Sequence, residues 1–190
     1  MNTEFEIRFT NIDRTKITEK IKELSWICTK ERTLMKRITF DNPLDPVNSY
    51  VRVRDEWDQV TCTYKNISKK LDIYAVKELE TTVGDLDTMV KILQNVGVKM
   101  KSYQETYRKT WSIDEEIDLM LDEWPGLNPF IEIEWDNEEV VRKYVEILGF
   151  DYEDWLFGAV DVVYTKELWI WAEVINNLEE ITFENPPIGN

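Results

Sequence analysis

"TEFEIRF", residues 3–9, alternates charged and apolar side chains, with Glu4, Glu6 and Arg8 at every second position. Successive side chains of a β-strand leave on opposite faces. The stretch therefore predicts a strand that has one charged and one apolar face. Taken alone, such a charged face is typical of a strand that faces solvent, so its meaning depends on the rest of the chain.

The same period of two recurs along the chain, at 33–41, 49–56, 59–65, 74–82, 103–111, 116–124 and 128–135. With residues 3–9 this predicts about eight strands. Helical periodicity marks three further segments, at 17–24, 86–93 and 140–148. Few connections are long enough for parallel crossovers. We therefore expect an α+β fold, with an antiparallel sheet or barrel and the helices packed outside.

Nearly every predicted strand carries charge at alternate positions, including Arg52 with Arg54, Arg108 beside Lys109, and Asp122. Helices outside a barrel need apolar strand faces to pack on, which turns the charged faces into the lumen. An unpaired buried charge costs several kcal/mol, so such a lumen must hold water, ions or a charged ligand. Carboxylates bind Mg²⁺ or Mn²⁺, and Arg and Lys bind phosphate. A metal-bound polyphosphate satisfies both; cross-strand ion pairs with a purely structural role are the alternative.

Composition excludes several classes of function. The 190 residues include 38 acidic and 23 basic side chains, for a net charge of −15, and no histidine. The acidic balance disfavours nucleic-acid and membrane partners, and the missing histidine excludes Ser-His-Asp and Cys-His nucleophiles and His-containing zinc sites. Cys28 and Cys62 are expected to be buried free thiols. The chain shows no leader and no membrane span, so we expect a soluble cytoplasmic protein.

The eight tryptophans raise the alternative of a carbohydrate site with a glycosidase carboxylate pair. That chemistry does not account for so many cations on the strands. The tryptophans are more simply explained as core or helix-packing residues; this expectation covers Trp26, Trp124, Trp155, Trp169 and Trp171.

A set of short motifs resembles one family. EFEIRF (4–9), TFDNP (39–43), YVRVRDE (50–56), TYK (63–65), KELE (77–80), YRKTW (107–111) and LDEWPGLNPFIEIEW (121–135) follow in the order of the strand motifs of the CYTH superfamily, the triphosphate tunnel metalloenzymes. The resemblance runs from residue 3 to about 150. It implies an eight-stranded antiparallel barrel that forms a tunnel, one side binding triphosphate and the other holding Mg²⁺ or Mn²⁺.

The resemblance also implies roles for individual residues. The metal side comprises Glu4, Glu6, Glu132 and Glu134, supported by Asp122, Glu78 and Glu80. The phosphate-binding side comprises Arg8, Arg52, Arg54, Lys65, Arg108 and Lys109. The chain departs from the family pattern where Arg8 replaces the usual lysine, where Thr106 stands in place of a second basic residue, and where GLNPF replaces G-L-G-x-F.

These implications point to a metal-dependent triphosphatase that acts on inorganic triphosphate, a nucleoside triphosphate or thiamine triphosphate. An adenylyl cyclase and a non-catalytic polyphosphate-binding module remain open as alternatives. Residues 1–155 are expected to form the tunnel barrel, and 156–190 a C-terminal helix, over about 158–170, and an extended tail packed on the same domain. We expect the end at Pro186 and Pro187 to be exposed. Whether this tail closes one mouth of the tunnel or covers an edge is open.

Overall fold

The computed structural model describes residues 2–67, 76–113, 117–135, 137–151 and 154–189, with backbone alone for 2–4. The elements in chain order are β1 (Asn2–Phe9), α1 (Arg14–Glu23), β2 (Ile27–Asp41), β3 (Ser49–Asp55), β4 (Val60–Ile67), β5 (Val76–Val83), α2 (Leu86–Asn95), β6 (Met100–Ile113), β7 (Ile117–Glu123), β8 (Phe130–Trp135), α3 (Glu138–Leu148), α4 (Asp161–Leu168), α5 (Ala172–Ile175) and β9 (Glu180–Ile181). None of the helices in these ranges is long and apolar enough to span a membrane.

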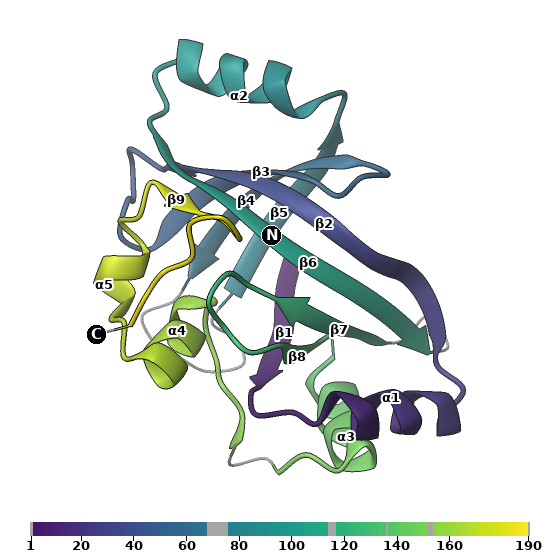
Figure 1. The fold of residues 1–190 in the computed structure, drawn as a ribbon. Helices are drawn as coiled ribbons and strands as arrows, with labels where there is room; N and C mark the ends of the chain where they lie inside the picture. The colour runs from purple at the N-terminus through teal and green to yellow at the C-terminus, as the bar shows by residue number, and fades with distance from the viewer. Residues whose placement is uncertain (1, 68–75, 114–116, 136, 152–153, 190) are drawn as a thin grey trace.

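Eight antiparallel strands curl into a barrel (Figure 1). Their order is β2-β3-β4-β5-β1-β8-β7-β6, and β6 pairs in turn with β2, which completes the ring. The short β9 adds to β6 in parallel. The expected antiparallel barrel with outer helices is thereby confirmed, and β2 begins six residues earlier than the sequence pattern predicted.

The strand register brings the charged positions to one common face. Glu6 lies opposite Glu134, and Arg8 opposite Glu132, on neighbouring strands β1 and β8. Because directly opposed residues share a face, the alternation at residues 3–9 continues around the barrel. Arg108 lies opposite Asp122 in the same way. The charged face is the inner face.

Amphipathic helices cover the outside of the barrel from two sides (Figure 1). Helices α1 and α3 bury residues such as Ile21 and Val145 against Ile7 and Ile133 of the strands. Helix α2 lies over Ile38, Phe40 and Val53 of β2 and β3 on the other side. Burial of these outer apolar side chains is what fixes the charged positions inside.

Local sequence signals set the limits of these helices. Asp13 accepts hydrogen bonds from the amides of Thr15 and Lys16 at the start of α1, and Asn137 caps α3 in the same manner. Helix α3 ends at Gly149, whose φ of 80° lies in the left-handed region that favours glycine.

The C-terminal segment packs against one end of the barrel. Its Val163, Tyr164 and Ile175 form an apolar cluster with Trp124 and Phe130, which occupy inward-facing positions of the barrel wall. The Tyr164 hydroxyl donates a 2.7 Å hydrogen bond to the carbonyl oxygen of Pro125. The segment therefore meets the interior of the barrel and does more than cover a strand edge.

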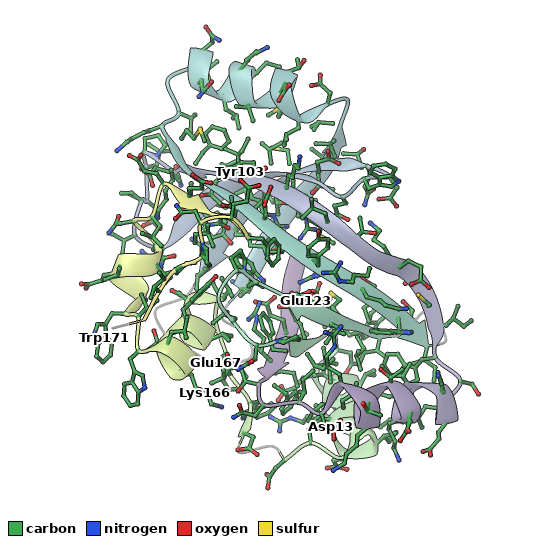
Figure 2. The ribbon with its side chains drawn as sticks, in the orientation of Figure 1. Asp13, Tyr103, Glu123, Lys166, Glu167 and Trp171 are labelled. Carbon is green, nitrogen blue, oxygen red and sulfur yellow. The ribbon has the colours of Figure 1, made fainter. Side chains whose placement is uncertain are left out.

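Some expectations about individual side chains are wrong. Trp169 and Trp171 are 76% and 66% exposed, because they flank the turn between α4 and α5 and point away from the barrel (Figure 2 labels Trp171). Cys28 is exposed on the long outer end of β2. Pro186 and Pro187 are half-buried, since the carbonyl of Pro187 lies against Gly126 of the β7–β8 turn.

The packing of the outer face yields a stability prediction. Ile133 is fully buried between the barrel and its helices, so Ile133→Ala removes apolar contacts and leaves a cavity. We expect a loss of about 2–5 kcal/mol in the free energy of unfolding, measured by urea denaturation. Ile188→Ala is the control, because Ile188 is 86% exposed. A loss below about 1 kcal/mol at Ile133 contradicts a helix-covered outer face.

Candidate functional site

The barrel encloses a cavity of about 530 Å³ that is lined from all eight strands. Its walls are mostly charged or hydroxyl-bearing, in contrast to the apolar outer face. Several of the charged lining residues are less than 10% exposed, among them Glu6, Arg37, Arg52 and Glu132. Buried charge of this density requires compensation by ion pairs, hydrogen bonds or a ligand.

One wall of the cavity is acidic. Glu6 of β1 and Glu132 and Glu134 of β8 each present a carboxylate oxygen, and these oxygens all lie within 4.8 Å of one another. Asp122 of β7 is 2% exposed and lines the same cavity. The side chain of Glu4, the remaining predicted metal-side residue of β1, lies outside the described residues. We call Glu6, Asp122, Glu132 and Glu134 the acidic wall.

Two predicted phosphate-binding residues lie within the acidic wall. Arg8 pairs with Glu132 at 2.6 Å and with Glu6 at 3.2 Å. Arg108 binds Asp122 through two hydrogen bonds of 2.7 and 2.6 Å and also reaches Glu132 at 2.8 Å. These contacts offset part of the negative charge of the wall.

The ion pairs of the acidic wall shift the titration of its members. Burial alone raises the pKa of Glu132, but Arg8 and Arg108 outweigh burial and hold that pKa well below its usual range. Burial likewise opposes the charged form of Arg108, and the carboxylates of Asp122 and Glu132 raise its pKa well above the ordinary value. Glu132 and Arg108 therefore stabilise each other in their charged forms.

The opposite wall is cationic and is built from β2 and β3. Arg37 lies directly across from Arg54, and Thr39 across from Arg52. Arg52 donates a 3.1 Å hydrogen bond to Thr63 and lies 3.4 Å from Glu80. We call Arg37, Arg52 and Arg54 the cationic wall. Burial and the nearby charge of Arg52 lower the pKa of Arg54 to about 10.

Glu78 and Glu80 of β5 were predicted to support the metal side, and both line the cavity. Glu78 pairs with Lys65 of β4, and Glu80 accepts a 2.6 Å hydrogen bond from Thr63 beside Arg52. Neither belongs to the group of closely spaced carboxylates. Their observed partners are the cations at their end of the barrel, including the predicted phosphate-binding Lys65.

Lys109 is not brought to the cavity. Its neighbour Arg108 occupies the inner face of β6, and adjacent strand residues point to opposite faces. The Lys109 ammonium instead pairs with Glu31 at 2.8 Å on the outside. Glu123 likewise points away from the cavity although its neighbour Asp122 points into it. Glu123, labelled in Figure 2, pairs with Arg32 at 2.9 Å. The structure therefore places Lys109 apart from the other predicted phosphate-binding residues.

The charged residues that line the cavity but were not predicted as site residues include Arg37, Lys30 and Glu56. The sequence pattern could have indicated that Arg37 faces inward. Ile38 and Phe40 are apolar and lie on the outer face, so Arg37 and Thr39, which alternate with them, lie on the inner face. Lys30 was missed because the predicted strand began only at residue 33.

The fold resembles known structures, although a scan against protein-family models and a search of curated protein sequences find no match. PH1012 from Pyrococcus horikoshii superimposes with a TM-score of 0.68 at 21% identity, over 80% of this chain and 93% of that one. A candidate adenylate cyclase from Vibrio parahaemolyticus gives 0.69 at 14% identity, over 86% and 98%. HpAC1 from Hippeastrum, a candidate adenylyl cyclase with a dominant triphosphatase activity, gives 0.56 at 17% identity, over 87% and 95%. These similarities confirm the fold implied by the resemblance to the CYTH superfamily.

The buried pair of Glu56 with Arg54 and Lys30 predicts a pH-dependent contribution to stability. Burial opposes ionisation of Glu56, but Arg54 and Lys30 outweigh it and lower the pKa from 4.5 to about 2. A depressed carboxyl pKa stabilises the fold above the unfolded value, and that contribution is lost as the pH falls through the folded value. Glu56→Gln should therefore lower the unfolding midpoint at pH 7. The deficit should shrink as the pH falls from about 4.5 towards 2.

The unfolding midpoint in urea, followed at several pH values, measures this effect. Glu19→Gln, on the exposed face of α1, is the matched control and should behave as the wild type does. A deficit at Glu56 that stays constant between pH 7 and pH 3 contradicts the ionic origin of this contribution.

Proposed function

We propose that this chain hydrolyses a triphosphate with the help of a divalent metal ion, inside the barrel cavity. The observation that carries the proposal is the division of one barrel cavity of about 530 Å³ into an acidic wall and a cationic wall. A triphosphate–metal complex has the matching distribution of charge, since its phosphate oxygens suit arginine and its cation suits carboxylates.

The cationic wall is the proposed binding surface for the phosphate chain. Arg52 and Arg54 project into the cavity from alternate positions of β3, and the buried Nε atom of each has no hydrogen-bond partner in the part of the chain that the structure describes. A buried N–H group without a partner is costly, and a phosphate oxygen relieves that cost. Lys65, Arg8 and Arg108 border the same cavity and complete the proposed set.

The acidic wall is the proposed metal site. Glu6, Glu132 and Glu134 fit a hard divalent cation such as Mg²⁺ or Mn²⁺, because their carboxylate oxygens lie close enough together to share one ion. Both oxygens of Glu132 already accept hydrogen bonds or ion pairs from Arg8 and Arg108. A bound cation supplies neutralisation of the phosphate charge and orientation of the reacting group.

The residues of the cavity then support hydrolysis in the following way. A water molecule attacks the terminal phosphorus, the bond from that phosphorus to its bridging oxygen breaks, and a carboxylate of the acidic wall accepts the proton of the water. Arg52 and Arg54 stabilise the negative charge that develops along the phosphate chain as this bond breaks. Positioning and charge neutralisation supply most of the rate, as in other phosphoryl transfers.

Product analysis tests the proposal. The protein is incubated with inorganic triphosphate, ATP or thiamine triphosphate, with Mg²⁺ or Mn²⁺ and in parallel with EDTA. Metal-dependent release of orthophosphate supports the triphosphatase. Cyclic AMP with pyrophosphate identifies a cyclase instead, and binding without turnover identifies a binding module; both results overturn the proposal.

A single substitution tests the assigned metal side. Glu134→Gln keeps the shape of the side chain but removes a carboxylate charge from the acidic wall. Since even residues that only support metal ligands typically contribute about 10- to 100-fold, we expect at least this loss in metal-dependent kcat/KM. Glu146→Gln, on the exposed face of α3, is the control and should retain full activity. Circular dichroism and urea denaturation verify that the variants remain folded; undiminished turnover by folded Glu134→Gln refutes the assignment.

A further inference from the structure

Arg37 is a buried arginine that the acidic residues of the barrel leave unpaired. Its side chain is 7% exposed and lines the cavity from β2. One terminal nitrogen, Nη2, donates a 2.7 Å hydrogen bond to the hydroxyl of Thr106, and Nε has no hydrogen-bond partner. Among the residues that the structure describes, no carboxylate lies within ion-pair distance of Arg37. Arg8, Arg54 and Arg108, by contrast, each have a carboxylate partner.

The charges that surround Arg37 are largely of its own sign. Burial and the neighbouring Arg54, Arg52 and Arg108 lower the pKa of Arg37 well below its ordinary value, against a weaker opposing effect of Asp122. Like charges gathered in a low-dielectric cavity destabilise the ligand-free protein. The fold therefore carries this arginine at a cost, and an anion between Arg37 and Arg54 would remove that cost.

The contacts of Arg37 hold its guanidinium in place without neutralising it. The guanidinium carbon lies 4.7 Å from the centre of the Trp124 ring, against which Tyr164 of the C-terminal segment packs edge-on. Stacking on tryptophan orients a guanidinium and leaves its charge in place. Thr106 contributes a hydroxyl, which is neutral. The site is thus a positioned cation next to the end of the barrel that the C-terminal segment contacts.

We infer that Arg37, oriented by Trp124 and Thr106 and opposed by Arg54, forms a subsite for one phosphate group of the ligand, and that this group is the terminal one. The assignment to a terminal phosphate follows from the position of Trp124, which lines the cavity and packs edge-on against Tyr164, where the C-terminal segment contacts one end of the barrel. The identity of the ligand as a triphosphate rests on the proposed function. The subsite itself rests on the charge, burial and contacts of Arg37.

Binding measured without metal tests the subsite separately from catalysis. Inorganic triphosphate is titrated calorimetrically into wild type and Arg37→Gln in EDTA. Loss of a charged hydrogen bond from a buried site predicts a Kd roughly 10- to 100-fold weaker for Arg37→Gln. Lys36→Gln is the matched control, because Lys36 is the adjacent residue of β2 and is exposed on the outer face. It should bind as the wild type does.

The melting temperature without ligand separates a binding role from a structural one. Removal of an arginine that is surrounded by like charges should leave the melting temperature of Arg37→Gln unchanged or raise it, whereas a structural arginine would lower it on removal. Arg37→Met is a second neutral variant that keeps the aliphatic stem. If both neutral variants fail to fold or melt well below wild type, Arg37 serves the fold and the inference is wrong.

A second-site variant provides a positive test. Because Thr106 contacts Arg37 directly, the double variant Arg37→Gln/Thr106→Lys would place an ammonium group in the same part of the cavity. We expect this change to restore triphosphate binding to within about 5-fold of wild type. No recovery, or wild-type affinity in Arg37→Gln alone, overturns the subsite.

The failure of this inference is distinguishable from failure of the proposed function. If wild type binds triphosphate through Arg37 but releases no orthophosphate with metal, the hydrolase proposal fails and the subsite stands. If wild type turns over and Arg37→Gln binds and turns over equally well, the subsite alone fails. A wild type that binds no triphosphate contradicts both.

Discussion

The packing of helices on the outer face of a closed barrel is the constraint on which the rest of this structure depends. Helices α1, α2 and α3 bury apolar positions of the strands, such as Ile133 and Phe40. Because side chains alternate between the two faces of a strand, the residues between these positions face inward. These inward-facing residues are charged on strand after strand. The interior can then be neither apolar nor empty, and the ion pairs of Arg8 and Arg108 with carboxylates are a direct consequence of the outer packing.

The buried charges of the two walls are paired within the protein to different degrees. Carboxylates of the acidic wall form ion pairs with Arg8 and Arg108. These pairs balance part of the negative charge of the wall within the protein. Within the described residues, the partners of Arg37 in the cationic wall are a hydroxyl and an aromatic ring, and the buried Nε atoms of Arg52 and Arg54 lack acceptors. Buried polar groups left without partners, as in the cationic wall, are typical of a site that exchanges stability for binding.

The periodicity of apolar and charged residues in the sequence predicted the strands, the outer helices and the inward direction of the charges. Each of these is a local consequence of side-chain period and burial. The periodicity did not separate Arg108 from Lys109, where the two neighbours differ only in the phase of the strand. Arg37 was missed although Ile38 and Phe40 indicated its phase, since it stands beside Lys36 in a strand with several other charged residues and resembles an ordinary surface position. The contact of the C-terminal segment with Trp124 and Phe130 joins residues far apart in the chain, and no local pattern encodes such a contact.

Under the proposed function, the arrangement of the walls makes binding of metal and binding of phosphate interdependent. A polyphosphate held by Arg52 and Arg54 brings negative charge towards Glu6 and Glu134, so its affinity is limited by repulsion from the acidic wall. A cation on these carboxylates converts that repulsion into attraction, and by reciprocity the phosphate must raise the affinity for the cation to the same extent. Arg8 and Arg108 reduce the repulsion before any cation binds, because they already pair with carboxylates of that wall. Positioned arginines within an acidic wall thus permit a cavity to accept an anion first and complete its charge balance with metal afterwards.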